Sequence, residues 1–273
     1  EIKKVVNSHY NFNMSCKDWL KIAIPSIKYN KRNTWINNVN KLKCKHKFRE
    51  NDNDLNHDKL TMSNVLNKIY NKTKSLKDKL IITTGVGNHQ MQTYQYIKSH
   101  YPKKILSSGS LGVMGCGIGY AIGAQIANPD KTVLLIDGDS SFNMTSTELK
   151  TIKEYNLPIK IAIMNNSSQQ MVNVWEELYF DKRFTATLNN NNPNYAQLAN
   201  SYGIPSVVCN NPEDLEDKIQ EFMDHPSAIL CEFKVEKGVC LPLVGPGKAL
   251  DDMILPEDYY NDNFVMEKGQ APS

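Results

Sequence analysis

The chain has 273 residues, of which 40% are hydrophobic, and this is enough for one large domain with a real core, with or without an appendage. The net charge of +3 is small and spread along the chain, and no aromatic residues interleave with the lysine-rich stretch 41–47. We therefore expect no nucleic-acid partner. No run reaches the roughly 18 apolar residues that a membrane helix requires, so we expect no membrane partner either.

Along the chain, a weakly patterned beginning gives way to alternating strands and helices. Residues 1–60 contain only short apolar pieces, and Arg49–Asp54 has the composition of a linker. Short apolar runs predict strands at 80–83, 105–106, 133–136, 159–164, 206–209 and 228–233. Helical patterns follow at 62–70, 89–97, 120–127, 145–155 and 212–223, the fourth introduced by the capping-box sequence Thr145–Glu148.

Fully apolar strands that alternate with helices indicate a parallel sheet covered on both faces. We therefore predict an α/β fold, a three-layer sandwich with a mostly parallel sheet of about six strands.

Three further features concern composition and the ends of the chain. The frequent Asn and Lys residues, in runs such as Asn189–Asn192, are interpreted as solvated surface and loops that arise from a bias towards AT-rich codons. The six cysteines lack CxxC spacing, which is typical of free thiols in a reducing compartment. The chain begins with Glu1 rather than methionine, so we expect a piece of a longer protein, with any targeting peptide outside it.

Four loops that follow predicted strands are rich in glycine or polar residues: 85–89, 108–117, 138–143 and 165–170. In a doubly wound sheet the ligand lies beyond the carboxyl ends of the strands. Glycine lets backbone N–H groups approach an anion, and a helix N-terminus favours negative charge. These loops favour a phosphate-bearing ligand, although such turns suit any nucleotide-like molecule.

Asp139 and Asn166 each follow a buried strand, 27 positions apart. Mg²⁺ prefers six oxygen ligands and is usually held by one or two side chains plus substrate phosphates. Asp139, Asn166 and the backbone carbonyl of Ser168 could supply three of them, with two diphosphate oxygens and a water completing the shell. In the alternative interpretation, Asp139 caps the helix at Thr145 and Asn166 only turns the chain.

Gly138-Asp139 together with Asn165-Asn166 is similar to the thiamine diphosphate (ThDP) motif, which begins Gly-Asp-Gly and closes with Asn-Asn. Four segments resemble acetolactate synthase large catalytic subunits: TTGVGNHQM (83–91), SGSLGVMGCGIGYAIGAQIANP (108–129), DGDSSFNMTSTEL (137–149) and LPLVGPGKALDDMI (241–254). The resemblance covers about residues 62–255 and implies the ThDP-binding fold. It further implies that residues 1–60 are the remnant of a central domain and linker, 61–255 the diphosphate- and Mg-binding domain, and 256–273 a C-terminal tail.

The resemblance also implies roles for individual residues. Asp139, Asn166 and Ser168 would hold Mg²⁺, Met114 would prop ThDP into its bent shape, and Met171 and Trp175 would shape the substrate channel. Residues 242–250 would fold over the site. The positions implied to bind ThDP are Gly87, Asn88, His89, Gly112, Met114, Asp139, Ser140, Ser141 and Asn166.

The sequence departs from the family at several of these positions. The family commonly has Gln at Asn88, larger polar or acidic residues at Ser167-Ser168, and Gly at Gln170. If the family glycine uses a positive φ, Gln170 would be strained. The resemblance places no catalytic residue within this chain, because the family's glutamate belongs to the N-terminal domain of a partner subunit. We therefore expect this piece alone to be inactive.

For the complete protein the resemblance implies an acetolactate synthase. Such an enzyme decarboxylates pyruvate and ligates the hydroxyethyl unit to a second small 2-ketoacid, in branched-chain amino-acid biosynthesis. It uses ThDP, Mg²⁺ and FAD, forms a homodimer or tetramer with a separate regulatory subunit, and lies in a plastid or mitochondrion. Two alternatives are another ThDP-dependent 2-ketoacid decarboxylase and a non-catalytic ThDP-fold subunit.

Overall fold

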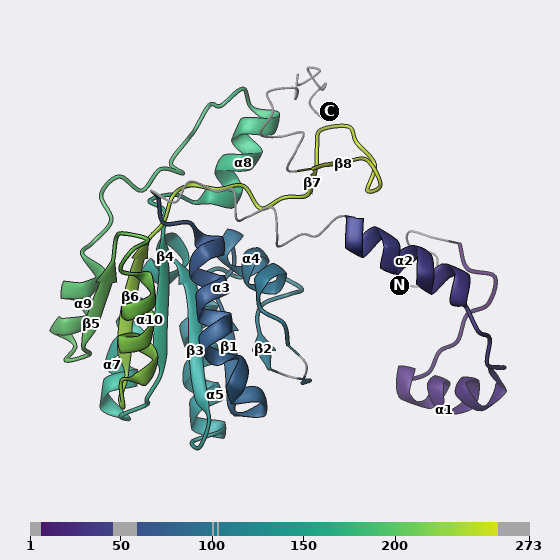
Figure 1. The fold of residues 1–273 in the computed structure, drawn as a ribbon, viewed down its shortest axis with the longest axis horizontal. Helices are drawn as coiled ribbons and strands as arrows, with labels where there is room; N and C mark the ends of the chain where they lie inside the picture. Colours follow the sequence, from purple (N-terminus) through teal and green to yellow (C-terminus); the bar gives the residue numbers. More distant parts are fainter. Residues whose placement is uncertain (1–6, 46–58, 100, 103, 256–273) are drawn as a thin grey trace. The chain divides into compact units, whose positions relative to one another are not determined.

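A computed structural model describes residues 7–45, 59–99, 101–102 and 104–255 of the chain (Figure 1). The chain divides into two compact units, residues 1–50 and 51–273. The first contains helices α1 (Cys16–Ser26) and α2 (Asn33–Lys45), neither of which has a buried residue. The predicted linker and the C-terminal tail lie outside the described residues. The assignment of residues 1–60 to a central domain stays a prediction.

The second unit is built on one six-stranded parallel sheet with the order β2-β1-β3-β4-β6-β5. The strands are β1 (Leu80–Thr84), β2 (Ile105–Leu106), β3 (Thr132–Gly138), β4 (Lys160–Asn165), β5 (Ser206–Cys209) and β6 (Ile229–Lys234). All six strands occur where the apolar runs predict them, and the predicted parallel sheet is confirmed. Because β2 and β3 lie on opposite sides of β1, the winding direction switches beside β1, where doubly wound sheets bind ligands.

Helices cover both faces of this sheet (Figure 1). One face of the sheet, which we call face one, is covered by α3 (Met62–Thr73), α4 (Asn88–Tyr96) and α10 (Leu215–Asp224). The opposite face, face two, is covered by α5 (Cys116–Ala127), α6 (Asp139–Asn143), α7 (Leu149–Glu154) and α9 (Tyr195–Ser201). Thr61 and Asn194 begin α3 and α9 by accepting bonds from the backbone N–H groups of Asn64 and Gln197. Short polar side chains at these positions satisfy helix donors that would otherwise lack partners.

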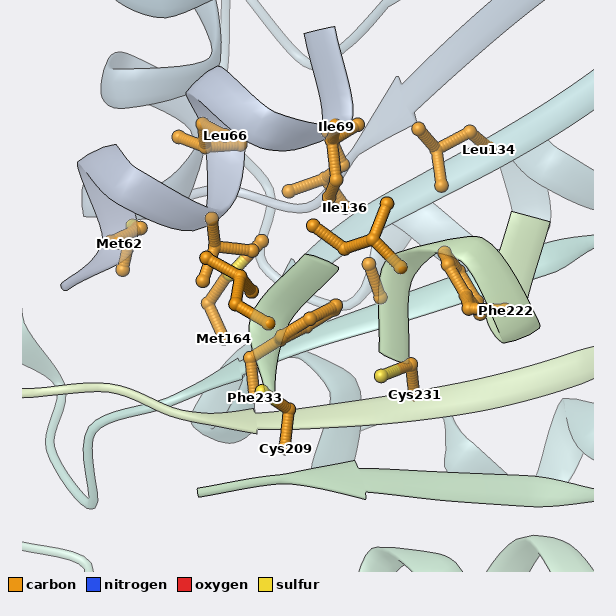
Figure 2. Close-up of a cluster of buried hydrophobic side chains, with 14 of the residues drawn as sticks. Met62, Leu66, Ile69, Leu134, Ile136, Met164, Cys209, Phe222, Cys231 and Phe233 are labelled. Atoms are coloured by element: carbon orange, nitrogen blue, oxygen red, sulfur yellow. The ribbon is translucent and has the colours of Figure 1, made fainter. Parts of the chain in front are cut away.

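The core follows from the alternation of side chains along each strand. In β3, Leu134 and Ile136 point into the face-one cluster, and Val133 and Leu135 point into the other. Figure 2 shows Leu66 and Ile69 of α3 gathered with Phe222 of α10 and Phe233 of β6 in the first cluster. Each fully buried side chain of this size contributes about 1.5–3 kcal/mol. The predicted three-layer sandwich is therefore confirmed.

Two predictions about helix starts are wrong. Helix α5 begins at Cys116 rather than Tyr120, because Gly115 takes a left-handed conformation (φ 81°) and serves as its N-cap. The capping box at Thr145 does not form: the Thr145 side chain accepts no bond from the helix, and its hydroxyl donates to the carbonyl of Gly115, 2.7 Å away. A 3₁₀ turn, η3 (Ser146–Glu148), precedes α7, which begins only at Leu149. Thr145 thus joins α5 to the segment after β3.

After the sheet, the chain forms the antiparallel pair β7 (Leu243–Val244) and β8 (Met253–Ile254). Leu241 and Ile254 pack with Val174 and Leu178 of α8 (Gln170–Tyr179) in a small third cluster. Figure 1 shows α8, β7 and β8 beyond the carboxyl ends of the strands. Within the described ranges, no helix is both long and apolar enough to cross a membrane.

Candidate functional site

A cavity of about 220 Å³ lies at the carboxyl ends of β1, β3 and β4. Loops that follow four different strands line it, including the loop 107–115 between β2 and α5. A larger cavity of about 260 Å³ lies beside β1 and β2, lined by residues such as Tyr70, Lys77 and Lys104, and contains none of the predicted site residues. We assign the functional site to the smaller cavity, because polar groups from four loops converge there at the switch point.

The structure brings nearly all the predicted site residues to this cavity. Only Trp175 is missing from its lining: the side chain is 56% exposed on α8 and stacks on Tyr179 with ring centroids 4.9 Å apart. The predicted residues that line the cavity are Gly87, Asn88, His89, Gly112, Met114, Asp139, Ser140, Ser141, Asn166, Ser168 and Met171.

One end of the cavity is built around the His89 ring and two glycines. A Cβ on Gly138 would lie 2.7 Å from His89 Nδ1, and one on Gly87 would lie 3.1 Å from His89 Cε1. Gly87 (φ 149°) is also the N-cap of α4, so the first N–H groups of this helix begin beside the cavity. Glycine at both positions leaves room for the ring and for an anion close to the backbone, which fits a diphosphate.

The His89 ring lies against the buried carboxylate of Asp137. His89 Nε2 is 3.2 Å from Asp137 Oδ1, within ion-pair distance, although the ring N–H is not aligned for a hydrogen bond. Asp137 Oδ1 accepts a bond of 2.9 Å from the N–H of Gly138, whereas no side chain or N–H of the described residues bonds Oδ2. Both side chains are buried, and the contact places the Asp137 carboxylate against one edge of the His89 ring.

Asp139, the first residue of α6, is the carboxylate of the site. It is almost fully buried, and this burial raises the pKa of its carboxyl group. Two side-chain amides counteract that effect: Asn189 Nδ2 and Asn192 Nδ2 donate to Asp139 Oδ2 at 2.9 and 2.7 Å. The Tyr195 hydroxyl donates to the backbone carbonyl of Asp139 at 3.1 Å. Asp139 is thus held by three side chains from one loop and the start of α9.

Asn166 and Ser168 face the same cavity from the loop after β4. Ser167 between them adopts a left-handed φ of 53°, which turns the chain. Within the described part of the chain, no group of three His, Cys, Asp or Glu side chains could hold a metal ion. One carboxylate with an amide and a backbone oxygen nevertheless fits Mg²⁺, which takes its remaining ligands from phosphate and water.

A buried polar network attaches the next loop to α8. The Glu176 carboxylate accepts bonds from the Thr187 hydroxyl (2.5 Å) and the Thr185 N–H (2.8 Å), and the first of these lowers the pKa of Glu176. The Gln169 N–H donates to the Thr187 carbonyl at 2.9 Å, and the Asn189 N–H donates to the Ser167 carbonyl at 2.9 Å. Residues 185–189 are therefore fixed beside the predicted metal ligands.

Sequence reasoning missed the most important part of this loop. The interpretation of Asn189–Asn192 as solvated surface is correct for Asn190 and Asn191, which are exposed, and wrong for Asn189 and Asn192. Neither residue follows a strand, and no spacing in the sequence connects them to Asp139. Tyr195 was also missed, since a buried tyrosine in a helix is ordinary core material until its hydroxyl partner is known.

Two of the departures from the family pattern, Gln170 and Asn88, have a clear structural outcome. Gln170 is the first residue of α8 and is not among the residues with positive φ, so the expected strain is absent. Asn88 is buried, and its amide donates to the Gly238 carbonyl at 3.0 Å. Asn88 therefore connects α4 to the segment after β6.

Comparison with known proteins identifies the family. The family described as thiamine pyrophosphate enzyme, C-terminal TPP binding domain, matches residues 85–233. The chain is 41% identical over 194 residues to "Acetolactate synthase, mitochondrial" of Schizosaccharomyces pombe, covering 71% of this chain and 29% of that protein. It is 34% identical over 245 residues to the mitochondrial acetolactate synthase catalytic subunit of Aspergillus candidus, covering 88% and 35%. It is 40% identical over 184 residues to the acetolactate synthase large subunit of Porphyra purpurea, covering 67% and 31%.

The chain thus spans about a third of the length of the curated relatives it matches. The family match covers more than half of the chain and includes the loops after β1, β2, β3 and β4 that line the cavity. This chain therefore belongs to the thiamine pyrophosphate (ThDP) enzymes and contains their C-terminal ThDP-binding domain.

Proposed function

We propose that the complete protein is a ThDP- and Mg²⁺-dependent acetolactate synthase. It would decarboxylate pyruvate and join the remaining two-carbon unit to a second 2-ketoacid. The observation that carries the proposal is the convergence of Asp139, Asn166 and the His89 loop on one cavity, in a chain similar to acetolactate synthases over most of its length.

The residues of the cavity divide into a polar and an apolar part. Asp139, Asn166 and the Ser168 backbone carbonyl would hold Mg²⁺, and the backbone at Gly87 with His89 would hold the diphosphate. Met114 and Met171 supply the apolar lining, where a flexible thioether side chain adapts to flat rings. ThDP, when bound, supplies an electron sink for decarboxylation, while the protein supplies binding, orientation and exclusion of water.

The partners and the compartment are part of the same proposal. The relatives named as catalytic or large subunits support an assembly of several chains with a regulatory subunit, and FAD would bind in the complete enzyme. The names of the fungal relatives support a mitochondrial location, with a plastid as the other organelle that we propose.

Calorimetry on the full-length protein tests the proposal, with ThDP and Mg²⁺ titrated into wild type and Asp139→Ala while acetolactate formation is followed in parallel. We expect wild type to bind both and to release acetolactate from pyruvate, and Asp139→Ala to lose cation-dependent binding. Absence of binding in the wild-type protein would refute the proposed site.

The same experiment separates two other functions. A different product from pyruvate or another 2-ketoacid would identify another ThDP-dependent decarboxylase. Binding without any product would identify a non-catalytic ThDP-fold subunit. The presence of Asn88, where the family commonly has Gln, favours this alternative. Gln170 does not favour that function, because it lies in helical conformation without the strain that a positive φ would cause.

A further inference from the structure

The four consecutive asparagines 189–192 are sorted by the fold into two that face Asp139 and two that face solvent. Asn189 Nδ2 and Asn192 Nδ2 both donate to Asp139 Oδ2. Asn190 and Asn191 are exposed. The run therefore holds chemically identical side chains in different environments at adjacent positions.

We propose that Asn189 and Asn192 are positioning residues of the cation site, which hold the Asp139 carboxylate in the correct orientation before the cation binds. This inference rests on the proposed function, because it deepens the account of the same site. It adds two residues from a distant loop to the strand-end groups that would touch the cation.

The buried Asp139 carboxylate requires hydrogen-bond donors around it. A carboxylate away from water is destabilised unless hydrogen-bond donors surround it. Asp139 is 1% exposed, and the two amides supply donors at 2.9 and 2.7 Å. A carboxylate offers about four acceptor positions, so two amide bonds leave room for a cation on the same group.

The Asn192 amide bonds to residues at the ends of two neighbouring strands. Asn192 Nδ2 also donates to Asn165 Oδ1 at 3.1 Å, and Asn165 immediately precedes the proposed cation ligand Asn166. One amide group therefore joins the end of β3 to the end of β4. Asn143 Nδ2 lies 3.4 Å from Asn192 Oδ1, which orients the Asn192 amide with its N–H groups towards Asp139.

The loop that carries the four asparagines is attached to the site on both sides of the run. The Asn189 N–H donates to the Ser167 carbonyl, and the Tyr195 hydroxyl donates to the Asp139 carbonyl. Tyr195 is fully buried and packs edge-on against Phe142, with ring centroids 5.9 Å apart. Attachments on both sides of the run fix the two inward amides, as positioning groups around metal ligands require.

The test measures cation affinity in the full-length protein at saturating ThDP, with Mg²⁺ by calorimetry and Mn²⁺ by electron paramagnetic resonance. The variants are Asn189→Ala and Asn192→Ala, and the matched controls are Asn190→Ala and Asn191→Ala. We expect cation binding to weaken by about 10–100-fold in each inward variant, the range for groups that orient metal ligands. The controls should stay within about twofold of wild type.

A second readout separates positioning from general structural support. If the inward asparagines act through the cation site, raising Mg²⁺ should restore ThDP binding in their variants to the wild-type level. Cation affinity equal to that of the controls would overturn the inference. Loss of ThDP binding that Mg²⁺ does not restore, together with a lowered melting temperature, would also overturn it. If wild type binds neither ThDP nor cation, the proposed function itself fails.

Discussion

Replacement of Gly85 by alanine tests whether the backbone of Gly85 packs as closely against the side chains of Asp137 and Ser141 as the structure describes. A Cβ at this position would lie 1.9 Å from Asp137 Oδ1 and 2.3 Å from Ser141 Oγ, and real Cβ contacts are essentially never shorter than 3.0 Å. Asp137 is fully buried, and the Gly138 N–H holds its Oδ1. The added Cβ would therefore have to displace a buried carboxylate that is held by a hydrogen bond.

Overpacking of a closed core costs about 1–3 kcal/mol, and the shortness of this contact puts Gly85→Ala at the upper end, about 3 kcal/mol. For a unit of this size that corresponds to a fall in melting temperature of about 6–12 °C. Thermal and urea unfolding of the variant would measure it. Gly109→Ala is the control, because a Cβ there meets nothing within 4 Å, and it should change stability by less than about 0.5 kcal/mol.

A double variant attributes the cost to the named contact. If the clash is with the Asp137 carboxylate, then Gly85→Ala should cost much less in an Asp137→Ala background, with a coupling of about 1–3 kcal/mol between the two sites. Equal stabilities for Gly85→Ala and Gly109→Ala, or purely additive effects in the double variant, would refute this account of the packing.

Three further substitutions probe the core, the loop and a buried cation. Phe222→Ala removes a fully buried ring that packs edge-on against Phe233, and should lower the free energy of unfolding by about 3–5 kcal/mol in urea titration; a loss below about 1 kcal/mol would contradict the packing. Tyr195→Phe leaves the Asp139 carbonyl without its hydroxyl donor and should cost about 1–3 kcal/mol by the same method, whereas a neutral result would show that the bond is not formed. Burial lowers the pKa of Lys160 from 10.5 to about 8, so the unfolded chain binds more protons than the folded chain between these values. The stability of wild type relative to Lys160→Met should therefore rise from about pH 8 to pH 10.5 and stay constant below pH 8, and a difference independent of pH in unfolding experiments would disprove the shift.

The sheet could be predicted because its signal is local. A strand buried on both faces is apolar at nearly every position. Runs such as Val133–Ile136 and Ile159–Met164, the second interrupted only by Lys160, can therefore be recognised without knowledge of their neighbours. The strand order could not be obtained in this way. It depends on which helices cover which face, and on the register that pairs Leu134 with both Ile82 and Lys160.

The capping box shows why a local signal can fail. The pattern Thr145–Glu148 contains both residue types that a capping box needs. The Thr145 side chain, however, is turned towards Gly115, 30 residues away, and its hydroxyl donates to the backbone carbonyl there. The nearby helix then begins in a 3₁₀ turn without a side-chain cap.

The candidate site likewise has a part that could be predicted from the sequence and a part that could not. The strand-end loops could be predicted because parallel strands deliver their carboxyl ends to one edge of the sheet. The asparagine amides that hold Asp139 lie 50 and 53 residues beyond it, and their own neighbours in the sequence are exposed. Only the return of the chain after α8 brings them to the cavity, so the composition of this run gave no sign of their role.

The departures from the family pattern at Ser167, Gln170 and Asn88 lie within the proposed site, and the structure shows how each of these residues is placed. The turn after β4 needs a left-handed residue, and Ser167 supplies it at φ 53°, which costs about 1–3 kcal/mol and leaves Gln170 free to begin α8. Gln170 Oε1 then lies 3.5 Å from Asn166 Nδ2, so the substituted side chain can steady the amide of a proposed cation ligand. Asn88 directs its side-chain amide to the Gly238 carbonyl, and its backbone N–H, at the start of α4, is a further donor that a diphosphate could use. A backbone donor does not depend on side-chain length, and the loss of one methylene at position 88 is therefore compatible with cofactor binding.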